Sequence, residues 1–286
     1  MSLIVTHNGP AHRDEFLACC ILLANGNTNI ARNSAPDFVA AALTDPQTYV
    51  VDIGLEHNTA MRNFDHHQLP ADAPATCALS LVLQHVTQLD MDTLRDLAPW
   101  LEFTEVLDSK GPRAAAKLVG VEGTAFDKFF STMSPIESII LNLFSKRSYV
   151  YSGDELGSIM FTIGKSILDG IIETKNRLAT LPEMCGIYSV NNLIVADVSD
   201  VHFDDKPLMG LELYLKRNFP DTAITVSQHE RNPGCLCVFR RDDHPSVDFT
   251  RIKNLRGTVF AHANGFMAVI NPAEVTVKQA IEASIV

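Results

Sequence analysis

Short apolar runs alternate with amphipathic stretches over the N-terminal part of the chain. The run SLIVT at residues 2–6 is rich in β-branched residues and ends at a turn signal, His7-Asn8-Gly9-Pro10. Residues 14–24 open with two acidic residues and continue as an apolar helix. Three further predicted elements keep the same order: a strand at 29–32, a helix at 36–43 and a strand at 48–53. This alternation predicts an α/β fold, with a parallel sheet and flanking helices.

The pattern changes toward the C-terminus. Helical periodicity follows the third strand at 75–85, 91–107, 125–130 and 135–144, and a long amphipathic stretch at 154–181 then reaches Pro182. Short strands are predicted after it, at 187–190, 193–198, 223–228, 235–239 and 258–261, with a closing helix from Pro272. We therefore predict three parts: an N-terminal α/β domain at 1–150, a helical linker at 151–183, and a smaller α+β domain at 184–286.

Length and composition limit the class of protein. The chain has 286 residues, 46% of them hydrophobic, which is enough apolar material for two buried cores. No apolar run approaches the roughly 18–20 residues of a membrane span, and residues 1–15 lack the basic and apolar regions of a secretory signal. We therefore expect a soluble, cytoplasmic protein with no membrane partner. The six cysteines form no CxxC pair, which is typical of reduced core residues.

Charge and missing motifs exclude several functions. The net charge of −11 argues against a sequence-independent grip on long duplex nucleic acid. It permits a short anionic substrate bound through metal ions, because bound cations can be the dominant local charges. No GxSxG, P-loop or GxGxxG motif occurs, so serine hydrolase, NTPase and dinucleotide-binding functions have no support.

Polar residues gather where the predicted strands of the first domain end. His7 follows the first strand, with His12 and Asp14 shortly after it, and Asp52 comes at the end of the third strand. Ligands of open parallel sheets bind at the carboxyl ends of the strands, so these side chains should meet at one edge.

The stretch NFDHHQ adds Asp65, His66 and His67 in the next loop. Taken alone, such a pair of histidines is more often part of a surface loop. Its convergence with two other loops favours a metal site instead. A mixture of imidazoles and carboxylates suits Mn²⁺, Fe²⁺ or Zn²⁺ better than Ca²⁺ or Mg²⁺.

Five motifs resemble those of a known group. They are HNGPAHRDE (7–15), VVDIG (50–54), FDHHQ (64–68), EVLDSKG (105–111) and GTVFAHANGF (257–266). In this order they resemble the motifs of the DHH phosphoesterase superfamily, and more closely its melanocyte-proliferating-gene-like branch of metal-dependent exonucleases. Two positions depart from the wider pattern. His12 stands where other DHH enzymes have an aspartate, and Met267-Ala268 stands where a glycine pair is usual.

The resemblance implies two divalent metal ions a few ångströms apart. Its ligands would be His7 and His12 for one ion, Asp14, His66 and Asp108 for the other, and Asp52 as a bridge between them. Mn²⁺ is the expected metal, with Mg²⁺, Fe²⁺ or Zn²⁺ as alternatives. For Asp108 the other interpretation is a solvated acidic residue near a helix end. The resemblance also implies that His67 faces the scissile phosphate, while Asp65 holds an imidazole in place.

These roles imply a metal-dependent phosphodiesterase that activates water with two metals. An exonuclease acting on RNA or single-stranded DNA is the first hypothesis. One alternative is a small-molecule phosphoesterase acting on pyrophosphate, a nucleotide bisphosphate or a dinucleotide. Another is a non-catalytic, metal-stabilised binding protein. The sequence sets neither the direction of digestion nor the oligomeric state.

The second domain is expected to select the substrate. Residues 216–256 hold eight Lys and Arg against five Asp and Glu, a net charge of +3 inside an acidic chain. This segment is either a solvated mixed surface or a grip on a terminal phosphate or sugar of a short single strand. The candidate substrate-binding residues are Arg240, Arg241, His262, Asn264 and Gly265.

Overall fold

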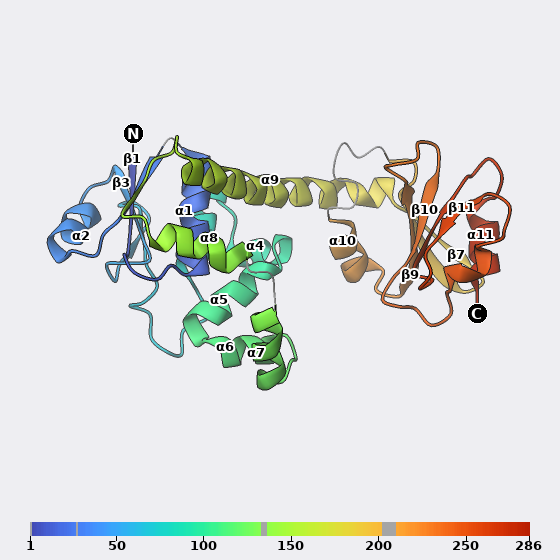
Figure 1. Ribbon diagram of the computed structural model, residues 1–286, viewed down its shortest axis with the longest axis horizontal. Helices are drawn as coiled ribbons and strands as arrows, with labels where there is room; N and C mark the ends of the chain where they lie inside the picture. The colour runs from blue at the N-terminus through green and yellow to red at the C-terminus, as the bar shows by residue number, and fades with distance from the viewer. Residues whose placement is uncertain (1, 27, 133–135, 202–209) are drawn as a thin grey trace. The chain divides into compact units, whose positions relative to one another are not determined.

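The computed structural model describes residues 2–26, 28–132, 136–201 and 210–286. Two compact units divide the chain, the first ending at Ile172 and the second beginning at Glu173 (Figure 1). Both units combine helices with a six-stranded sheet, so the chain is of mixed α/β class. Among the described residues, no helix is both long and apolar enough to cross a bilayer.

The sheet of the first unit is parallel at its centre. Its strands are β1 (Ser2–Thr6), β2 (Thr28–Arg32), β3 (Thr48–Val51), β4 (His57–Asn58), β5 (Asn63–Phe64) and β6 (Tyr149–Val150). They lie in the order β4-β5-β3-β1-β2-β6, and β1 pairs in parallel with both β2 and β3. The edge strands β4 and β6 pair antiparallel with their neighbours. The predicted parallel core is confirmed, and the sequence analysis missed the short strands β4, β5 and β6.

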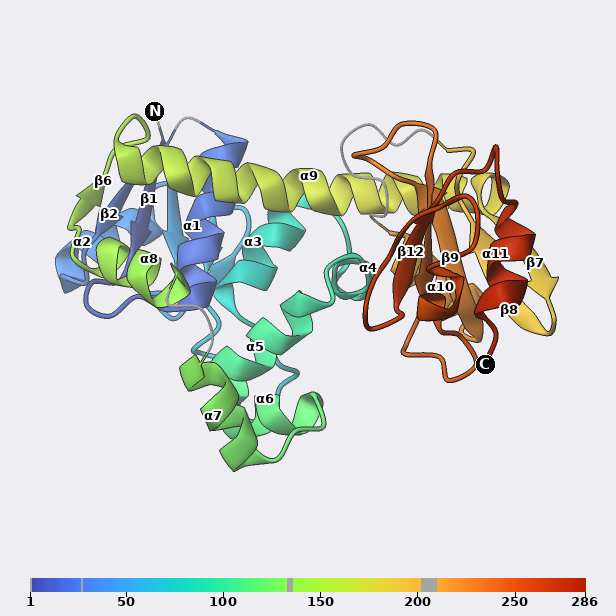
Figure 2. The ribbon, with the colours of Figure 1, turned by 45° about the vertical axis from the view of Figure 1, so that its right-hand side comes forward.

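Helices cover both faces of this sheet. On one face α2 (Pro36–Leu43) packs Ala42 against Val5 and Val50. On the other face α1 (Arg13–Asn25) and α3 (Ala78–Thr87) supply most of the main core, together with α8 (Ile136–Ser145) (Figure 2). The two layers bury the sheet and leave its strand ends free to carry polar side chains.

A run of short helices follows α3. They are α4 (Met91–Leu97), α5 (Trp100–Lys110), α6 (Pro112–Leu118) and α7 (Gly123–Thr132). The single helix predicted at 91–107 is wrong, because the chain leaves helical geometry at Ala98 (φ −131°, ψ 75°) before Pro99. A residue before proline is disfavoured in the helical region. The first residue of the predicted helix 135–144 lies outside the described residues.

Helix α9 (Glu155–Met184) contains the boundary between the two units, in the region predicted as a linker. It continues past Pro182, where the sequence analysis ended it. In the first unit α9 lies very close to α1: a Cβ on Gly164 would be 1.9 Å from the carbonyl oxygen of Cys20. Only glycine allows the two backbones to approach this closely.

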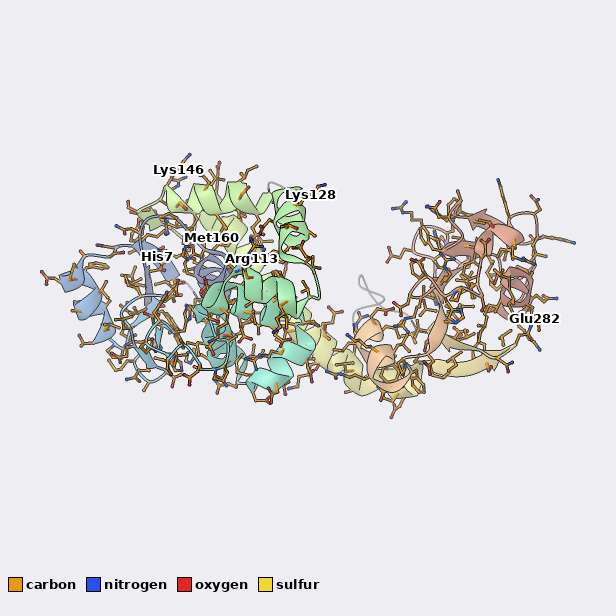
Figure 3. All side chains as sticks on the ribbon, turned by 90° about the horizontal axis from the view of Figure 1, so that it is seen from below. His7, Arg113, Lys128, Lys146, Met160 and Glu282 are labelled. Carbon is orange, nitrogen blue, oxygen red and sulfur yellow. The ribbon has the colours of Figure 1, made fainter. Side chains whose placement is uncertain are left out.

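The second unit has its own sheet, in the order β11-β12-β10-β9-β8-β7. The strands are β7 (Gly186–Val190), β8 (Leu193–Asp197), β9 (Thr222–Gln228), β10 (Leu236–Arg240), β11 (Thr258–Ala261) and β12 (Met267–Ile270). Its helices are α10 (Leu211–Asn218), a 3₁₀ turn η1 (Phe249–Ile252) and α11 (Val277–Ser284). Figure 3 labels His7 in the first unit and Glu282 on α11. Strand β12 and helix α10 were not predicted from the sequence, and α11 begins five residues after the predicted start of the closing helix.

Candidate metal centre

The predicted ligands of the first unit come together at the carboxyl edge of its sheet. His7 directly follows β1 and Asp52 directly follows β3, and these two strands are neighbours and parallel. His12 and Asp14 come from the start of α1, which follows the same turn as His7. Strand order alone therefore places four side chains from two chain segments beside one another.

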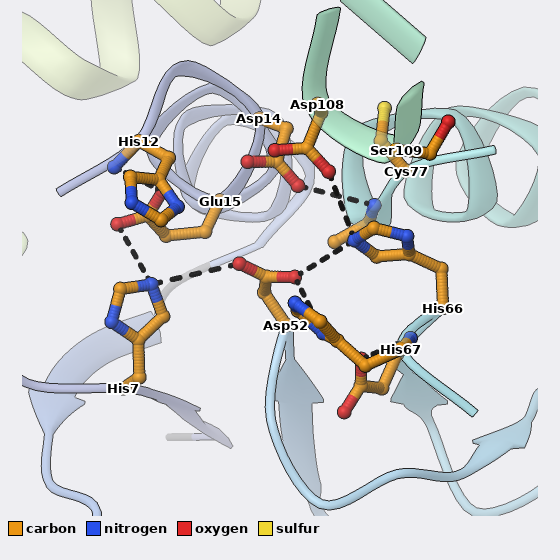
Figure 4. Close-up of polar contacts among 12 residues, drawn as sticks. His7, His12, Asp14, Glu15, Asp52, His66, His67, Cys77, Asp108 and Ser109 are labelled. Atoms are coloured by element: carbon orange, nitrogen blue, oxygen red, sulfur yellow. Dashed lines mark hydrogen bonds and ion pairs between the residues drawn. The ribbon is translucent and has the colours of Figure 1, made fainter. Parts of the chain in front are cut away.

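Asp52 lies at the centre of the cluster (Figure 4). Its Oδ2 is 3.5 Å from His7 Nε2, and its Oδ1 is 3.3 Å from His66 Nε2. The backbone of Asp52 is left-handed, with φ 57°, which ends β3 two residues earlier than predicted and turns the carboxylate into the site. Asp tolerates this conformation better than most residues. One carboxylate oxygen thus faces each of two histidines.

The second histidine also meets a helix-borne carboxylate. His66 Nε2 is 3.0 Å from Asp108 Oδ2, which belongs to the last turn of α5. Asp14 lies with Asp108 and His12 in a group whose ligand atoms are within 4.8 Å of one another. The backbone N–H of Ala78, at the N-terminus of α3, donates to Asp14 Oδ2 at 3.3 Å. A helix N-terminus stabilises a buried carboxylate in this position.

The donor atoms fit a divalent metal. Five buried side-chain atoms at the site have no hydrogen-bond partner among the described residues: His7 Nε2, Asp14 Oδ1, Glu15 Oε1, Asp52 Oδ1 and His66 Nε2. Buried polar atoms are normally satisfied, so such a cluster calls for a ligand. Ligands about 2.1 Å from one tetrahedral ion lie about 3.4 Å apart. The separations of 3.0–3.5 Å around Asp52 match that value.

The imidazole of His7 is held in the orientation that metal binding needs. Its Nδ1 donates to the carbonyl oxygen of Asn8 at 2.9 Å. This bond leaves the lone pair of Nε2 for a metal, as in most histidine ligands.

Glu15 is a site residue that the sequence analysis missed. Its side chain is fully buried, and its Oε1 is 3.2 Å from His7 Nε2. The ligand atoms of His7, His12, Glu15 and Asp52 all lie within 4.8 Å of one another. Of the acidic pair at the start of α1, Asp14 was predicted as a ligand, whereas Glu15 was interpreted only as a helix-start signal. Glu15 could have been recognised from its place in the motif HNGPAHRDE.

His66 and His67 do not point in opposite directions, as an extended loop would place them. Their ring centroids are 4.4 Å apart, and His67 Nδ1 is 3.6 Å from Asp52 Oδ1. Their exposure differs, since the side chain of His66 is 7% exposed and that of His67 is 54% exposed. A turn at residues 67–69 replaces the extended geometry, with the Leu69 N–H bonded to the His66 carbonyl.

Asp65 holds His67 in place. Its Oδ1 accepts from the backbone N–H of His67 at 3.0 Å and from the ring Nδ1 at 2.7 Å. Its Oδ2 accepts from the N–H of Leu55 at 2.7 Å. With Nδ1–H donated to Asp65, the other ring nitrogen of His67 is free to exchange a proton with a substrate.

Without metal, the buried charges strongly perturb one another. The nearby carboxylates of Asp52 and Glu15 raise the pKa of His7 to about 10. Burial lowers the pKa of His66, but the nearby carboxylates of Asp108 and Asp52 outweigh this and raise the pKa to about 10. Burial and the neighbouring carboxylates raise the pKa of Asp14 well above its usual range. Clusters with such strong shifts occur preferentially at functional sites.

A cavity of about 190 Å³ adjoins the exposed side of the site. It is bounded by His66, His67 and Asp108 on one side and by Ser109 and Lys110 on the other, with residues 69–76 between them. Lys110 Nζ donates to the carbonyl oxygens of residues 71 and 73, each at 2.7 Å. The cavity therefore leads from the candidate ligands to a bound cationic side chain.

The predicted substrate residues of the second unit divide into two kinds. Arg241 is 7% exposed, and its guanidinium bonds Glu212 Oε2 at 2.9 Å and the Thr222 carbonyl at 3.3 Å. These contacts hold α10 to the sheet, and the substrate role of Arg241 stays a prediction. Arg240 donates to the Val247 carbonyl at 2.9 Å and to Asp243 at 2.7 Å. The two arginines therefore do not form an open basic surface.

His262, Asn264 and Gly265 form the turn between β11 and β12. The ring Nδ1 of His262 accepts from the Asn264 N–H at 3.1 Å, and the ring lies 4.0 Å from that of Phe266. Gly265 has φ 68°, and a Cβ there would be 2.1 Å from Asp248 Oδ1. The turn is tightly built, and nothing in it tests a substrate role.

The fold and the site define a class: an α/β protein with a histidine- and carboxylate-rich candidate metal site at the strand ends of its first sheet. Residues 3–75 match the family model MYG1_exonuc, described as an uncharacterised protein family (UPF0160). This match confirms the resemblance to the melanocyte-proliferating-gene-like branch over that segment. It includes every candidate ligand of the first unit except Asp108.

Two curated relatives are similar over the same region. The chain is 40% identical over 68 residues to the MYG1 exonuclease of Mus musculus and 43% identical over 68 residues to that of Rattus norvegicus. Each match covers 23% of this chain, and 17% and 16% of the respective relatives. The chain thus matches less than a fifth of the length of either relative.

Two solved structures show only a weak likeness. The pGpG-specific phosphodiesterase PggH from Vibrio cholerae is 13% identical with a TM-score of 0.30, over 98% of this chain and 94% of that one. RecJ from Thermus thermophilus, in complex with Mn²⁺, is 14% identical with a TM-score of 0.27, over 98% of this chain and 52% of that one. At such TM-scores neither likeness carries an argument about this protein.

Proposed function

We propose that this protein is a divalent-metal-dependent phosphodiesterase, and that it acts as an exonuclease on RNA or single-stranded DNA. The observation that carries the proposal is the position of Asp52, which turns one carboxylate oxygen toward His7 and the other toward His66. A carboxylate shared in this way suits two ions about 3.5–4 Å apart. The relatives named MYG1 exonuclease supply the type of reaction.

The ligand assignment follows the two ends of the cluster. The proposed ligands are His7 and His12 for the first ion, Asp14, His66 and Asp108 for the second, and Asp52 for both. Nitrogen and oxygen donors of this kind suit Mn²⁺, which we propose as the preferred metal, and would also hold Fe²⁺ or Zn²⁺. When bound, the ions would supply a water of lowered pKa and would neutralise charge on the phosphoryl oxygens.

His67 is the proposed acid or orienting group. Its side chain is more exposed than any of the buried ligands around it and borders the cavity. Asp65 holds Nδ1, so the protonated ring presents Nε2–H to a phosphoryl or leaving-group oxygen. The same bond fixes the ring plane, which keeps the proton in line with the substrate.

The size of the cavity also fits a second candidate function. A volume of about 190 Å³ would take a phosphate with part of a sugar or base, but not several nucleotides. A small-molecule phosphoesterase acting on a dinucleotide, a nucleotide bisphosphate or pyrophosphate would use the same site. The two functions differ in whether activity increases with substrate length.

A substrate panel with controlled metal tests the proposal. The full chain is stripped with chelator and assayed on short RNA, short DNA, dinucleotides and pyrophosphate, before and after addition of Mn²⁺. We expect no hydrolysis without metal and restored release of mononucleotides with Mn²⁺. The variant Asp52→Asn should abolish this activity, and the exposed Asp92→Asn should not. Activity that survives chelation, or that Mn²⁺ fails to restore on every substrate, contradicts the proposal.

A further inference from the structure

Glu15 has a carboxylate oxygen that makes no hydrogen bond among the described residues. Its side chain is fully buried at the start of α1. Oε2 accepts from the backbone N–H of His12 at 2.6 Å, which caps the helix. Oε1 has no hydrogen bond among the described residues and points toward His7 Nε2, 3.2 Å away (Figure 4). Capping the helix therefore accounts for only one of the two oxygens.

A buried cationic side chain lies close to Glu15 Oε1. Arg32, the last residue of β2, has a side chain that is 0% exposed, and its Nη2 is 3.6 Å from Glu15 Oε1. Its Nη1 donates to the carbonyl oxygens of Gly9 at 3.1 Å and Phe144 at 3.2 Å. The guanidinium also lies over the ring of Phe144, 4.5 Å from its centroid. These contacts fix a charge in place beside the metal centre.

We propose that Glu15 is a further protein ligand of the ion held by His7 and His12, and that Arg32 positions its carboxylate. The inference rests on the proposed metal-dependent function. Glu15 Oε1 would bind the ion while Oε2 keeps the helix cap. Arg32 would restrain the carboxylate through its contact with Oε1, as charged partners of metal ligands commonly do.

Donor spacing and charge both support this assignment. Donor atoms of one tetrahedral shell lie about 3.4 Å apart. Glu15 Oε1 and Asp52 Oδ2 lie 3.2 and 3.5 Å from the same nitrogen, His7 Nε2. Two neutral imidazoles and a shared carboxylate would leave most of the charge of a divalent ion uncompensated in a buried place. A second carboxylate reduces that excess, and Arg32 offsets part of the charge of Glu15 when no metal is bound.

The variant Glu15→Gln separates metal binding by Glu15 from its role in capping α1. Gln serves as well as Glu in the capping position, because its carbonyl oxygen accepts the same backbone bond. It removes the charged donor that a metal needs. If Glu15 only caps α1, the variant should bind metal as the wild type does.

The experiment measures Mn²⁺ binding to chelator-treated full chain by calorimetry, with bound Mn²⁺ counted by elemental analysis. We expect about two ions per wild-type chain. Glu15→Gln should weaken one of them by at least about 10-fold, and Asp92→Asn should match the wild type. In a His66→Gln background, which removes a ligand of the other ion, adding Glu15→Gln should weaken the remaining binding.

The possible outcomes distinguish the role of Glu15 from the proposed metal-dependent function. A wild type that binds no Mn²⁺ overturns the metal-dependent function. A wild type with two ions and a Glu15→Gln variant with unchanged affinities overturns the role of Glu15 alone. If Glu15→Gln does not fold, as judged by circular dichroism, Glu15→Asp replaces it. This variant keeps the charge beside Arg32 but shortens the reach, and unchanged affinity there also overturns the inference.

Arg32→Lys tests the positioning residue. Lysine keeps the charge but cannot reproduce the planar contacts to two carbonyls and the ring of Phe144. We expect about 10-fold weaker binding of one Mn²⁺. A lower melting temperature in chelator with unchanged Mn²⁺ affinity would mean that Arg32 only stabilises the fold.

Discussion

Two adjacent histidines in this chain have different surroundings. His66 is buried between Asp52 and Asp108, whereas His67 borders a cavity and is held by Asp65. Because both rings face the same carboxylate, direction along the chain does not separate their roles. Burial and the identity of the second partner do, since a ligand needs a dry, anionic environment and an acid needs access to substrate.

His66→Ala and His67→Ala should therefore fail in different ways. His66→Ala is expected to lower bound Mn²⁺ and to lose the thermal stabilisation that Mn²⁺ provides, because binding energy lost from the native state is stability lost. His67→Ala should keep its metal and lose about 10²- to 10⁴-fold in kcat. Elemental analysis beside turnover decides this. Equal metal loss in both variants would contradict the division, and full activity of His67→Ala would remove that residue from the mechanism.

The histidine pKa values predict how metal-free protein responds to pH. His7 and His66 have pKa values raised from 6.5 to about 10 by their carboxylate partners. A raised folded pKa contributes stability that is complete below the unfolded pKa and is lost as pH rises through the folded one. The melting temperature in chelator should therefore fall between about pH 6.5 and 10.

Mn²⁺ should reverse this trend, because it needs the neutral imidazoles and competes with their protons. His66→Gln should flatten the decline in chelator, since it removes one of the two titrating groups. Thermal melts at half-unit pH steps measure both effects. A profile that is flat without metal would show that the ion pairs around Asp52 do not form in solution.

At the scale of elements, close packing of two helices supports the site. Helix α9 reaches α1 at Gly164, over the carbonyl of Cys20, and α1 carries His12, Asp14 and Glu15 at its other end. A rigid α1 keeps three candidate ligands at fixed distances from the strand ends. Gly164 of α9 thus matters to the candidate metal centre through its contact with α1.

Gly164→Ala is expected to destabilise the protein by about 1–3 kcal/mol through overpacking. In an isolated helix the same change is stabilising by up to about 1 kcal/mol, so a loss can only come from the contact with α1. Denaturant unfolding followed by circular dichroism measures it. Gly153→Ala serves as the control, because no heavy atom lies within 4 Å of a Cβ built there. Equal stabilities of the two variants would contradict the close approach.

At the scale of the whole molecule, the two kinds of candidate site residue are divided between the two units. All candidate ligands lie in the first unit, and the predicted substrate residues lie in the second. A net charge of −11 opposes anionic substrates in general, so bound metal ions would supply most of the local attraction. The second unit is then expected to affect longer substrates more than small ones.

His262→Ala tests this expectation. We expect a higher KM for an oligonucleotide than in the wild type, with little change for a small chromogenic phosphodiester, because the small substrate has no further nucleotides for the turn to recognise. His229→Ala is the matched control, since its ring Nδ1 likewise accepts a backbone N–H, that of Asn232 at 3.0 Å. Equal changes in KM on both substrates would argue against a recognition role for the turn at 262–265.

The sequence by itself determined the main helices and strands of the first unit and the sheet edge at which the candidate site residues lie. Strands β1 to β3 and helices α1 and α2 lie within two residues of their predicted bounds, because apolar periodicity and turn residues are local signals. The short strands β4 to β6 escaped prediction, since two-residue pairings depend on neighbours distant in the chain. His7, His12, Asp14, Asp52 and His66 could be named in advance, because strand ends and motif order place them together.

Only the tertiary structure decided which neighbours these residues have. Glu15 became a candidate ligand because its Oε1, which makes no hydrogen bond, lies close to His7 and to Arg32 of β2. Arg241 was predicted to contact substrate, and only the structure shows that its side chain is buried and bonded to Glu212. Burial and the partner of a charge depend on chain segments far apart in sequence, so no local pattern of residues contains them.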